Sequence, residues 1–206
     1  AIALLFMAIL ISGRLFWLHT FDNKQQPEIQ NGVLDLREWD LSKIPIFTLD
    51  GEWMVSPYHL LTGTESQLSN TSSFSFISVP GDWSKVINPS NDSTYGFGSY
   101  YLKILVDPEA DELFSLRVPS VRSSSAVFVN GNRIGGSGRV GETKENTEDI
   151  NLPYTSSTIR PDESGVIHLI IQCANFNDPR SSGIARSIKF GLEQPLISDT
   201  QQSISL

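Results

Sequence analysis

The sequence predicts an all-β fold, a sandwich or barrel of antiparallel strands preceded by an apolar N-terminal helix. Beyond Gly32, short runs of alternating apolar and polar residues are separated by Gly, Pro, Asn and Ser, which is the pattern of half-buried strands joined by turns. No run after Phe21 keeps a helical period, so only short helical turns are expected, for instance near residues 56–61. With 39% hydrophobic and 18% charged residues, the chain has the composition of a protein that forms a core.

The N-terminal segment, residues 1–21, is predicted to be a transmembrane anchor or signal segment. It reaches the roughly 20 mostly apolar residues that a bilayer span needs. Arg14 lies near enough to one end to snorkel, and Trp17 suits the membrane interface. A cleaved signal peptide and a buried core helix are the alternatives, although no small-x-small cleavage site is visible. Residues 22–31 are then expected to form a linker.

Several strands are predicted from a side-chain period of two, and most read as antiparallel sheet. The side chains assigned to the core face are Tyr100, Leu102, Ile104, Val106, Phe114, Leu116, Val118, Ile167, Leu169, Ile171, Cys173, Ile188 and Phe190. Those assigned to the opposite face are Tyr101, Lys103, Ser115, Arg117 and His168. Further candidate strands cover residues 33–36, 47–55, 74–79 and 149–152.

A hairpin is predicted at Asn130-Gly131, because this dipeptide lies between two β-prone runs and tolerates the positive φ angles of a tight turn. Shortly after it, residues 136–141 read GSGRVG, a literal match to G-x-G-x-x-G. In dinucleotide folds that pattern opens a helix whose N-terminus approaches a pyrophosphate. Here polar sequence follows and no βαβ unit surrounds the run, so a flexible glycine-rich loop is predicted instead.

Charge and composition exclude several functions. A formal net charge of −8 argues against nucleic acid as a partner, since phosphate binding depends on basic residues. A single cysteine, Cys173, excludes an internal disulfide and a cysteine-based zinc cluster. The three histidines have no second ligand at metal-binding spacing, and no G-x-S-x-G elbow is present. We therefore expect no cofactor and no catalytic site in this chain, while a structural calcium ion is left open.

Five short motifs occur in an order that resembles the sugar-binding jelly rolls of family 2 glycoside hydrolases. The same order is similar to the extracytoplasmic jelly-roll sensor domains of bacterial seven-transmembrane receptors with diverse intracellular signalling modules. The resemblance covers residues 32–192 and is carried by DGEWMV (50–55), VPGDW (79–83), YGFGSYYLKILVD (95–107), VFVNGNRIGGSGRVG (127–141) and SGIARSIKFG (182–191).

The resemblance implies a jelly-roll, galactose-binding-domain-like sandwich over residues 32–192. Two departures favour the receptor version: Ser187 follows Arg186 where the hydrolase pattern carries Asp, and this sequence carries no catalytic-barrel pattern. An apolar segment directly before the domain also suits a receptor. Residues 193–206 are then expected to be a linker toward a missing C-terminal region, which in such receptors leads to membrane helices and a kinase or cyclase. The missing initiator Met also predicts a fragment of a longer protein.

The expected function is ligand sensing outside the cell membrane, with a carbohydrate or similar small polar molecule as the ligand. Sugar sites pair aromatic faces with planar polar groups. The candidate ligand-binding residues are Trp83, Tyr95, Phe97, Asn175, Asp178 and Arg180. The alternatives are a sugar-binding accessory domain of a secreted glycoside hydrolase and a module that forms homodimers through a sandwich face or an edge strand.

Overall fold

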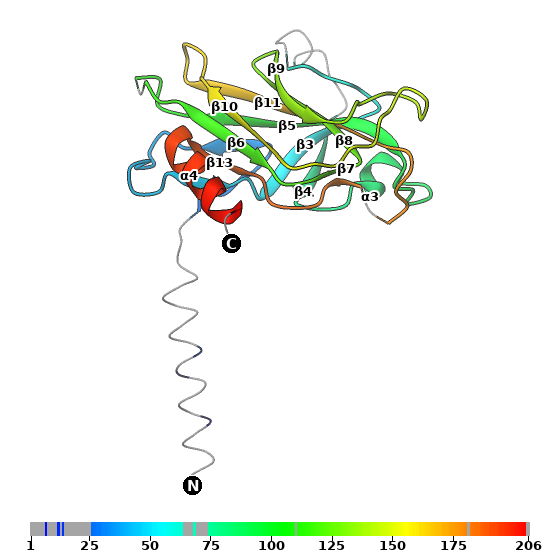
Figure 1. The fold of residues 1–206 in the computed structure, drawn as a ribbon, viewed down its shortest axis with the longest axis horizontal. Helices are drawn as coiled ribbons and strands as arrows, with labels where there is room; N and C mark the ends of the chain where they lie inside the picture. Colours follow the sequence, from blue (N-terminus) through cyan, green and yellow to red (C-terminus); the bar gives the residue numbers. More distant parts are fainter. Residues whose placement is uncertain are drawn as a thin grey trace.

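The computed structural model describes residues 7, 12, 14, 26–63, 68, 74–109, 111–180 and 182–204. Over these ranges the chain forms a sandwich of two sheets, which confirms the all-β prediction (Figure 1). Nearly all strand pairs are antiparallel, and the pair β1 with β5 is parallel.

The larger sheet is built around two ten-residue strands, β5 and β11, which pair along their whole length. Its strands, in spatial order, are β4 (Ser75–Val79), β3 (Gly51–Pro57), β5 (Gly96–Leu105), β11 (Val166–Asn175), β8 (Ser124–Val129) and β9 (Asn132–Ser137), with β1 (Val33–Asp35) beside β5. The smaller sheet has the order β10 (Tyr154–Ile159), β6 (Phe114–Val118), β13 (Lys189–Leu192) and β2 (Ile46–Thr48). A short ribbon joins β12 (Gly183–Ile184) to β7 (Val121–Arg122).

The core lies between the two sheets and contains every side chain that the alternation assigned to it. Three aromatic rings pack together in it: Trp83 stacks on Tyr100 with ring centroids 6.1 Å apart, and Trp53 meets Tyr100 edge-on at 6.4 Å. Such pairs add roughly 0.5–1.5 kcal/mol beyond the area that they bury. The Cys173 thiol is also fully buried here.

The outer face of the larger sheet is partly covered rather than fully solvated. Leu61, Tyr101 and Ile170 form a second buried cluster on this face. The Tyr101 hydroxyl lies 2.8 Å from Nδ1 of His168, so both side chains lie opposite the main core, as the alternation predicts. Gln172 donates to the Leu61 carbonyl at 2.9 Å, which ties the connection after β3 to the sheet.

The predicted hairpin is confirmed. Asn130 and Gly131 have φ angles of 48° and 83° between β8 and β9. Positive φ at both central positions defines the tight turn whose twist matches that of paired strands.

Three local predictions are wrong. Residues 47–55 form two strands in different sheets, because the chain crosses from β2 to β3 at Leu49, whose backbone amide donates to the Ile188 carbonyl. The expected strand at residues 149–152 is irregular, and the strand lies further on, at Tyr154–Ile159. The helical turn expected near residues 56–61 is absent, and helix α3 (Ser84–Ile87) supplies one elsewhere.

A helix that the sequence analysis did not predict follows the last strand. Helix α4 (Glu193–Ile204) occupies the segment expected to be a linker and packs against β13 and β6. Leu196 is fully buried beneath it, and Lys189 pairs with Asp199 at 2.7 Å. This helix explains why Ser115, expected to face solvent, is fully buried.

The predicted N-terminal helix falls almost entirely outside the described residues. Met7, Ser12 and Arg14 are described, and each is helical. Within the described ranges, no helix combines the length and apolarity required to cross a membrane.

Candidate functional site

The candidate site lies at the end of the sandwich where β5 begins, β11 ends and β8 begins. The strand register places Asn175 beside Gly96 and Ala174 beside Ser124, so three strand ends meet at this edge. Helix α3 and the loop after β11 lie at the same end of the domain (Figure 1). The loops between these elements carry the polar groups of the site.

Asn175, the last residue of β11, is a buried anchor for this end of the sandwich. Its Oδ1 accepts hydrogen bonds from Ser123 Oγ at 2.9 Å and from the Asp178 backbone amide at 3.0 Å. Its Nδ2 donates to the carbonyl oxygens of Thr94 at 3.1 Å and Asp178 at 2.8 Å. One carboxamide therefore joins three chain segments and satisfies the backbone polar groups that a buried loop leaves unpaired.

Thr94 links these segments to the α3 region. Its carbonyl oxygen accepts from Trp83 Nε1 at 3.1 Å as well as from Asn175. Its hydroxyl donates to the Asp178 carbonyl at 3.0 Å. The segments that carry the predicted site residues are therefore brought to one end of the sandwich.

Two of the predicted ligand contacts lie in the core. The side chains of Trp83 and Asn175 are 0% exposed, so neither can touch a ligand in this conformation. Trp83 is stacked on Tyr100 and its ring faces are covered. Both residues hold the loops in place, and the assignment of direct contact to them is corrected.

Asp178 is held by two arginines. Its Oδ1 accepts from the backbone amide and Nε of Arg180 at 2.9 and 3.1 Å, and its Oδ2 accepts from Nη2 of Arg180 at 3.2 Å and Nη1 of Arg122 at 3.0 Å. The hydrogen bonds from the Arg180 side chain lower the pKa of Asp178 to about 2. With both oxygens occupied, Asp178 acts by orienting Arg180, whose side chain is 79% exposed.

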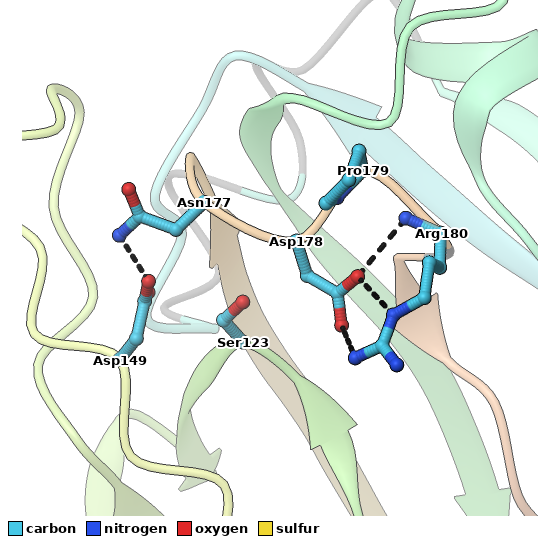
Figure 2. Close-up of a pocket in the computed structure, with 6 residues that line it drawn as sticks. All are labelled: Ser123, Asp149, Asn177, Asp178, Pro179 and Arg180. Carbon is cyan, nitrogen blue, oxygen red and sulfur yellow. Dashed lines mark hydrogen bonds and ion pairs between the residues drawn. The ribbon is translucent and has the colours of Figure 1, made fainter.

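A shallow, open pocket of about 460 Å³ lies between these groups (Figure 2). The residues that line it are Ser123, Asp149, Asn177, Asp178, Pro179 and Arg180. On one side, Asn177 Nδ2 donates to Asp149 Oδ2, and on the other side the Arg180 guanidinium lies against Asp178. One side of the pocket therefore presents the carboxylate of Asp149 and the amide of Asn177, and the other side presents the guanidinium of Arg180.

Asp149 and Asn177 were not among the residues predicted from the sequence to bind a ligand. Asn177 lies inside the polar loop of residues 175–180, which supplied three of the predicted ligand-binding residues, so its position carried a usable signal. The sequence pattern predicts a strand at Asp149, and the contact of this residue with Asn177 spans 28 positions along the chain. No local sequence pattern predicts such a pair.

The glycine-rich run places Asp149. The backbones of Arg139 and Glu148 pair at 3.0 and 2.9 Å, so the run forms an ordered turn in place of the flexible loop that was predicted. Gly138 has a φ of +72°, and a Cβ there would lie 2.2 Å from the Glu148 carbonyl oxygen. Glycine is therefore required for the 148–150 segment to approach this closely.

The two remaining predicted residues lie beside the pocket without lining it. Tyr95 is 42% exposed in the loop before β5. Phe97 projects from β5 and meets Tyr58 edge-on, with ring centroids 5.6 Å apart. The Tyr58 hydroxyl in turn donates to Asn88 Oδ1 at 2.5 Å. These rings form a partly exposed aromatic surface next to the loop that contains Thr94.

The structure offers no metal centre in the part of the chain that it describes, where no group of three or more His, Cys, Asp or Glu side chains converges. Burial raises the pKa of the Cys173 thiol well above its ordinary value. A raised pKa and full burial are the opposite of what a nucleophilic thiolate requires. The described side chains that line the pocket present hydrogen-bonding and charged groups.

The fold and the pocket place the chain among β-sandwich domains with polar loops at one end. The crystal structure of the Ruminococcus gnavus β-glucuronidase matches 72% of this chain and 28% of its own chain, at a TM-score of 0.50 and 16% identity. The same enzyme with D-glucuronic acid matches 72% and 29%, at 0.51 and 16%. Its apo form also matches 72% and 29%, at 0.52 and 15%.

This chain therefore spans less than a third of the enzyme that it resembles. At such low identity the likeness establishes the sandwich fold alone. No protein family and no curated protein matches the chain by sequence.

Proposed function

We propose that this chain is the extracytoplasmic ligand-sensing domain of a membrane signalling receptor, and that it binds a carbohydrate or a similar small polar ligand. The observation that carries the proposal is the pocket, in which Arg180, Asn177 and Asp149 present a guanidinium, an amide and a carboxylate around one depression. Planar groups of these kinds bind hydroxyl-rich molecules with defined geometry. The ligand site then lies on loops held by a rigid sandwich, as is common for binding proteins.

The positions of the two chain ends support attachment to a membrane. Gln26 accepts a hydrogen bond from the backbone amide of Thr48 on β2, and α4 packs against β13 and β6. Both ends of the described domain therefore leave from the smaller sheet, away from the pocket loops (Figure 1). In a receptor whose two flanking segments enter the same membrane, both chain ends must leave the domain on the side that faces that membrane. Residues 1–21 would supply the anchor.

The second candidate is a sugar-binding accessory domain of a secreted glycoside hydrolase. The observation that favours it is the match to β-glucuronidase, which covers less than a third of that enzyme. Under this alternative the pocket has the same role, while the apolar segment is a cleaved signal and any catalytic carboxylates belong to another domain.

A reporter fusion separates these proposals. Alkaline phosphatase, which is active only after export, is fused behind residue 206 and the fusion is expressed in a bacterial host. If the chain is a receptor domain, we expect phosphatase activity in the membrane fraction. Deletion of residues 1–21 is expected to abolish it. Active fusion released as a shortened soluble protein would favour the accessory domain, and an inactive cytoplasmic fusion would overturn both.

Ligand binding is tested by saturation-transfer NMR on the 206-residue chain, in micelles of a detergent without a sugar headgroup. We expect binding of neutral hexoses and its loss in Arg180→Ala. The matched control is Arg160→Ala, because Arg160 is another exposed arginine paired with an aspartate, at 3.0 Å from Asp111, outside the pocket. Equal binding by the Arg180→Ala and Arg160→Ala variants would contradict the proposed site.

A further inference from the structure

We infer that Asp149 is the specificity-determining residue of the pocket, and that it accepts hydrogen bonds from two vicinal hydroxyl groups of the ligand. The inference rests on the proposed function and narrows the ligand class to polyols with a free diol edge. It is drawn from the hydrogen bonds that remain available in the pocket.

Two carboxylates line the pocket, and only one of them has free capacity. Asp178 accepts four hydrogen bonds, three from Arg180 and one from Arg122, so its oxygens are occupied. Asp149 accepts one, from Asn177 to Oδ2, and its Oδ1 has no hydrogen-bond partner among the described residues. An ionised carboxylate has about four acceptor positions and no donor. Asp149 therefore keeps acceptor capacity that no described residue uses.

The Asp149 carboxylate is exposed but its backbone is held firmly. The backbone pairing of Arg139 with Glu148 fixes the residue before it. On the other side, Ser137 Oγ donates to the Ile150 carbonyl at 2.7 Å. A ligand therefore meets an acceptor whose position needs little reordering, which reduces the entropic cost of binding.

The opposite wall of the pocket supplies hydrogen-bond donors, from Arg180. Nη1 of Arg180 makes no hydrogen bond within the described residues, while Nε and Nη2 are fixed by Asp178. A guanidinium donates and never accepts. The pocket thus combines an acceptor side at Asp149 with a donor side at Arg180, which suits a polyol that donates from one edge and accepts at the other.

Vicinal hydroxyls fit the Asp149 side better than a single donor. Each oxygen of the carboxylate can take one hydroxyl, and bonds to a charged acceptor are about twice as strong as neutral ones. A ligand edge that bears a carboxylate would be repelled by Asp149. The charge of Asp149 therefore favours a sugar edge with hydroxyl groups over an edge with a carboxylate on this side of the pocket.

The test combines a change in the protein with a change in the ligand and measures the binding affinity of each combination. Affinities are measured by NMR titration of the whole 206-residue chain in a detergent without a sugar headgroup. The probes are D-glucose, D-galactose and D-mannose, each with its monodeoxy analogues. For the hexose that binds, we expect Asp149→Asn to weaken binding at least about tenfold, which is the lower end of the range for one hydrogen bond to a charged group. Removal of either of two adjacent hydroxyls should weaken binding to the wild type and have little effect in Asp149→Asn.

The control variant is Asp111→Asn, whose side chain is 94% exposed and lies outside this pocket, and it should bind as the wild type does. If a hexose binds and every deoxygenation effect persists in Asp149→Asn, the role of Asp149 is overturned while the sugar-binding function stands. If none of the three hexoses binds, the proposed function at this pocket fails together with the inference. Thermal unfolding of Asp149→Asn should match that of the wild type, which separates a binding defect from a folding defect.

Discussion

Asn175 and Asp178 bind each other twice at the end of β11: the Asn175 Oδ1 accepts from the Asp178 amide at 3.0 Å, and the Asn175 Nδ2 donates to the Asp178 carbonyl at 2.8 Å. The buried carboxamide takes the place of a strand partner just where the sheet ends. It folds the loop back so that the Asp178 side chain meets Arg180 at the pocket wall (Figure 2). The pocket therefore depends on a residue that does not line it.

Asn175→Ala is expected to lower the free energy of unfolding by about 2–4 kcal/mol, because several buried partners lose their hydrogen bond at once. Asn175→Asp should be at least as damaging, since an oxygen would then face the carbonyls of Thr94 and Asp178. Urea denaturation measures both. Asn177→Ala, which removes an exposed amide from the same loop, should stay within about 0.5 kcal/mol of the wild type. Equal losses for Asn175→Ala and Asn177→Ala would count against the anchoring role.

The Asp178 carboxyl group is expected to titrate with a midpoint near pH 2, because hydrogen bonds from the Arg180 side chain lower its pKa to about 2. Its pKa in the unfolded chain is about 3.9. Since the folded value is the lower one, the stabilising contribution of the ionised group is complete above about pH 4 and is lost as the pH falls toward 2. Carbon-detected NMR of the Asp178 carboxyl measures the midpoint. It should rise in Arg180→Ala, and a wild-type midpoint near 4 would contradict the pairing.

Gly138→Ala is expected to destabilise the protein and to weaken ligand binding together. The new Cβ would lie 2.2 Å from the Glu148 carbonyl oxygen and 2.9 Å from the Ile150 amide nitrogen, so the segment that carries Asp149 must move. The strained φ alone costs about 1–3 kcal/mol. Gly131→Ala is the matched control, because Gly131 also has a positive φ, of 83°, but lies in the β8–β9 turn. It should lose stability and keep ligand binding; a Gly138→Ala variant with normal affinity would refute the positioning role.

Leu196→Ala is expected to loosen α4 from the smaller sheet. Leu196 is fully buried, and replacement of a buried leucine by alanine costs about 2–5 kcal/mol. Hydrogen exchange should quicken in residues 193–204 more than in β5 and β11. Ser198→Ala on the exposed side of the same helix should leave exchange unchanged, and equal protection in both variants would show that Leu196 does not hold the helix.

The alternating strands could be predicted because their signal is local. In β5, Tyr100, Leu102 and Ile104 repeat every second position, and burial on one face follows directly from that period. Asn130-Gly131 was equally visible, because the turn needs positive φ at two adjacent residues.

Helix α4 and the pocket had no comparable signal. The helix is mostly polar, and contacts with distant residues stabilise it, among them the pairing of Asp199 with Lys189 on β13. The burial of Trp83 depends on Tyr100, which follows it after another loop. Asp149 and Asn177 become neighbours only through the arrangement of the strands that precede them. Such relationships arise from tertiary packing and leave no short-range pattern.

The positions of the two chain ends have a practical consequence for measurement. Gln26 is fixed to β2, and α4 covers the same sheet, while the pocket loops lie at one end of the sandwich. A biosensor chip or bead coupled beyond residue 204 would therefore hold the domain by its flank and leave the loops open to bulk solution.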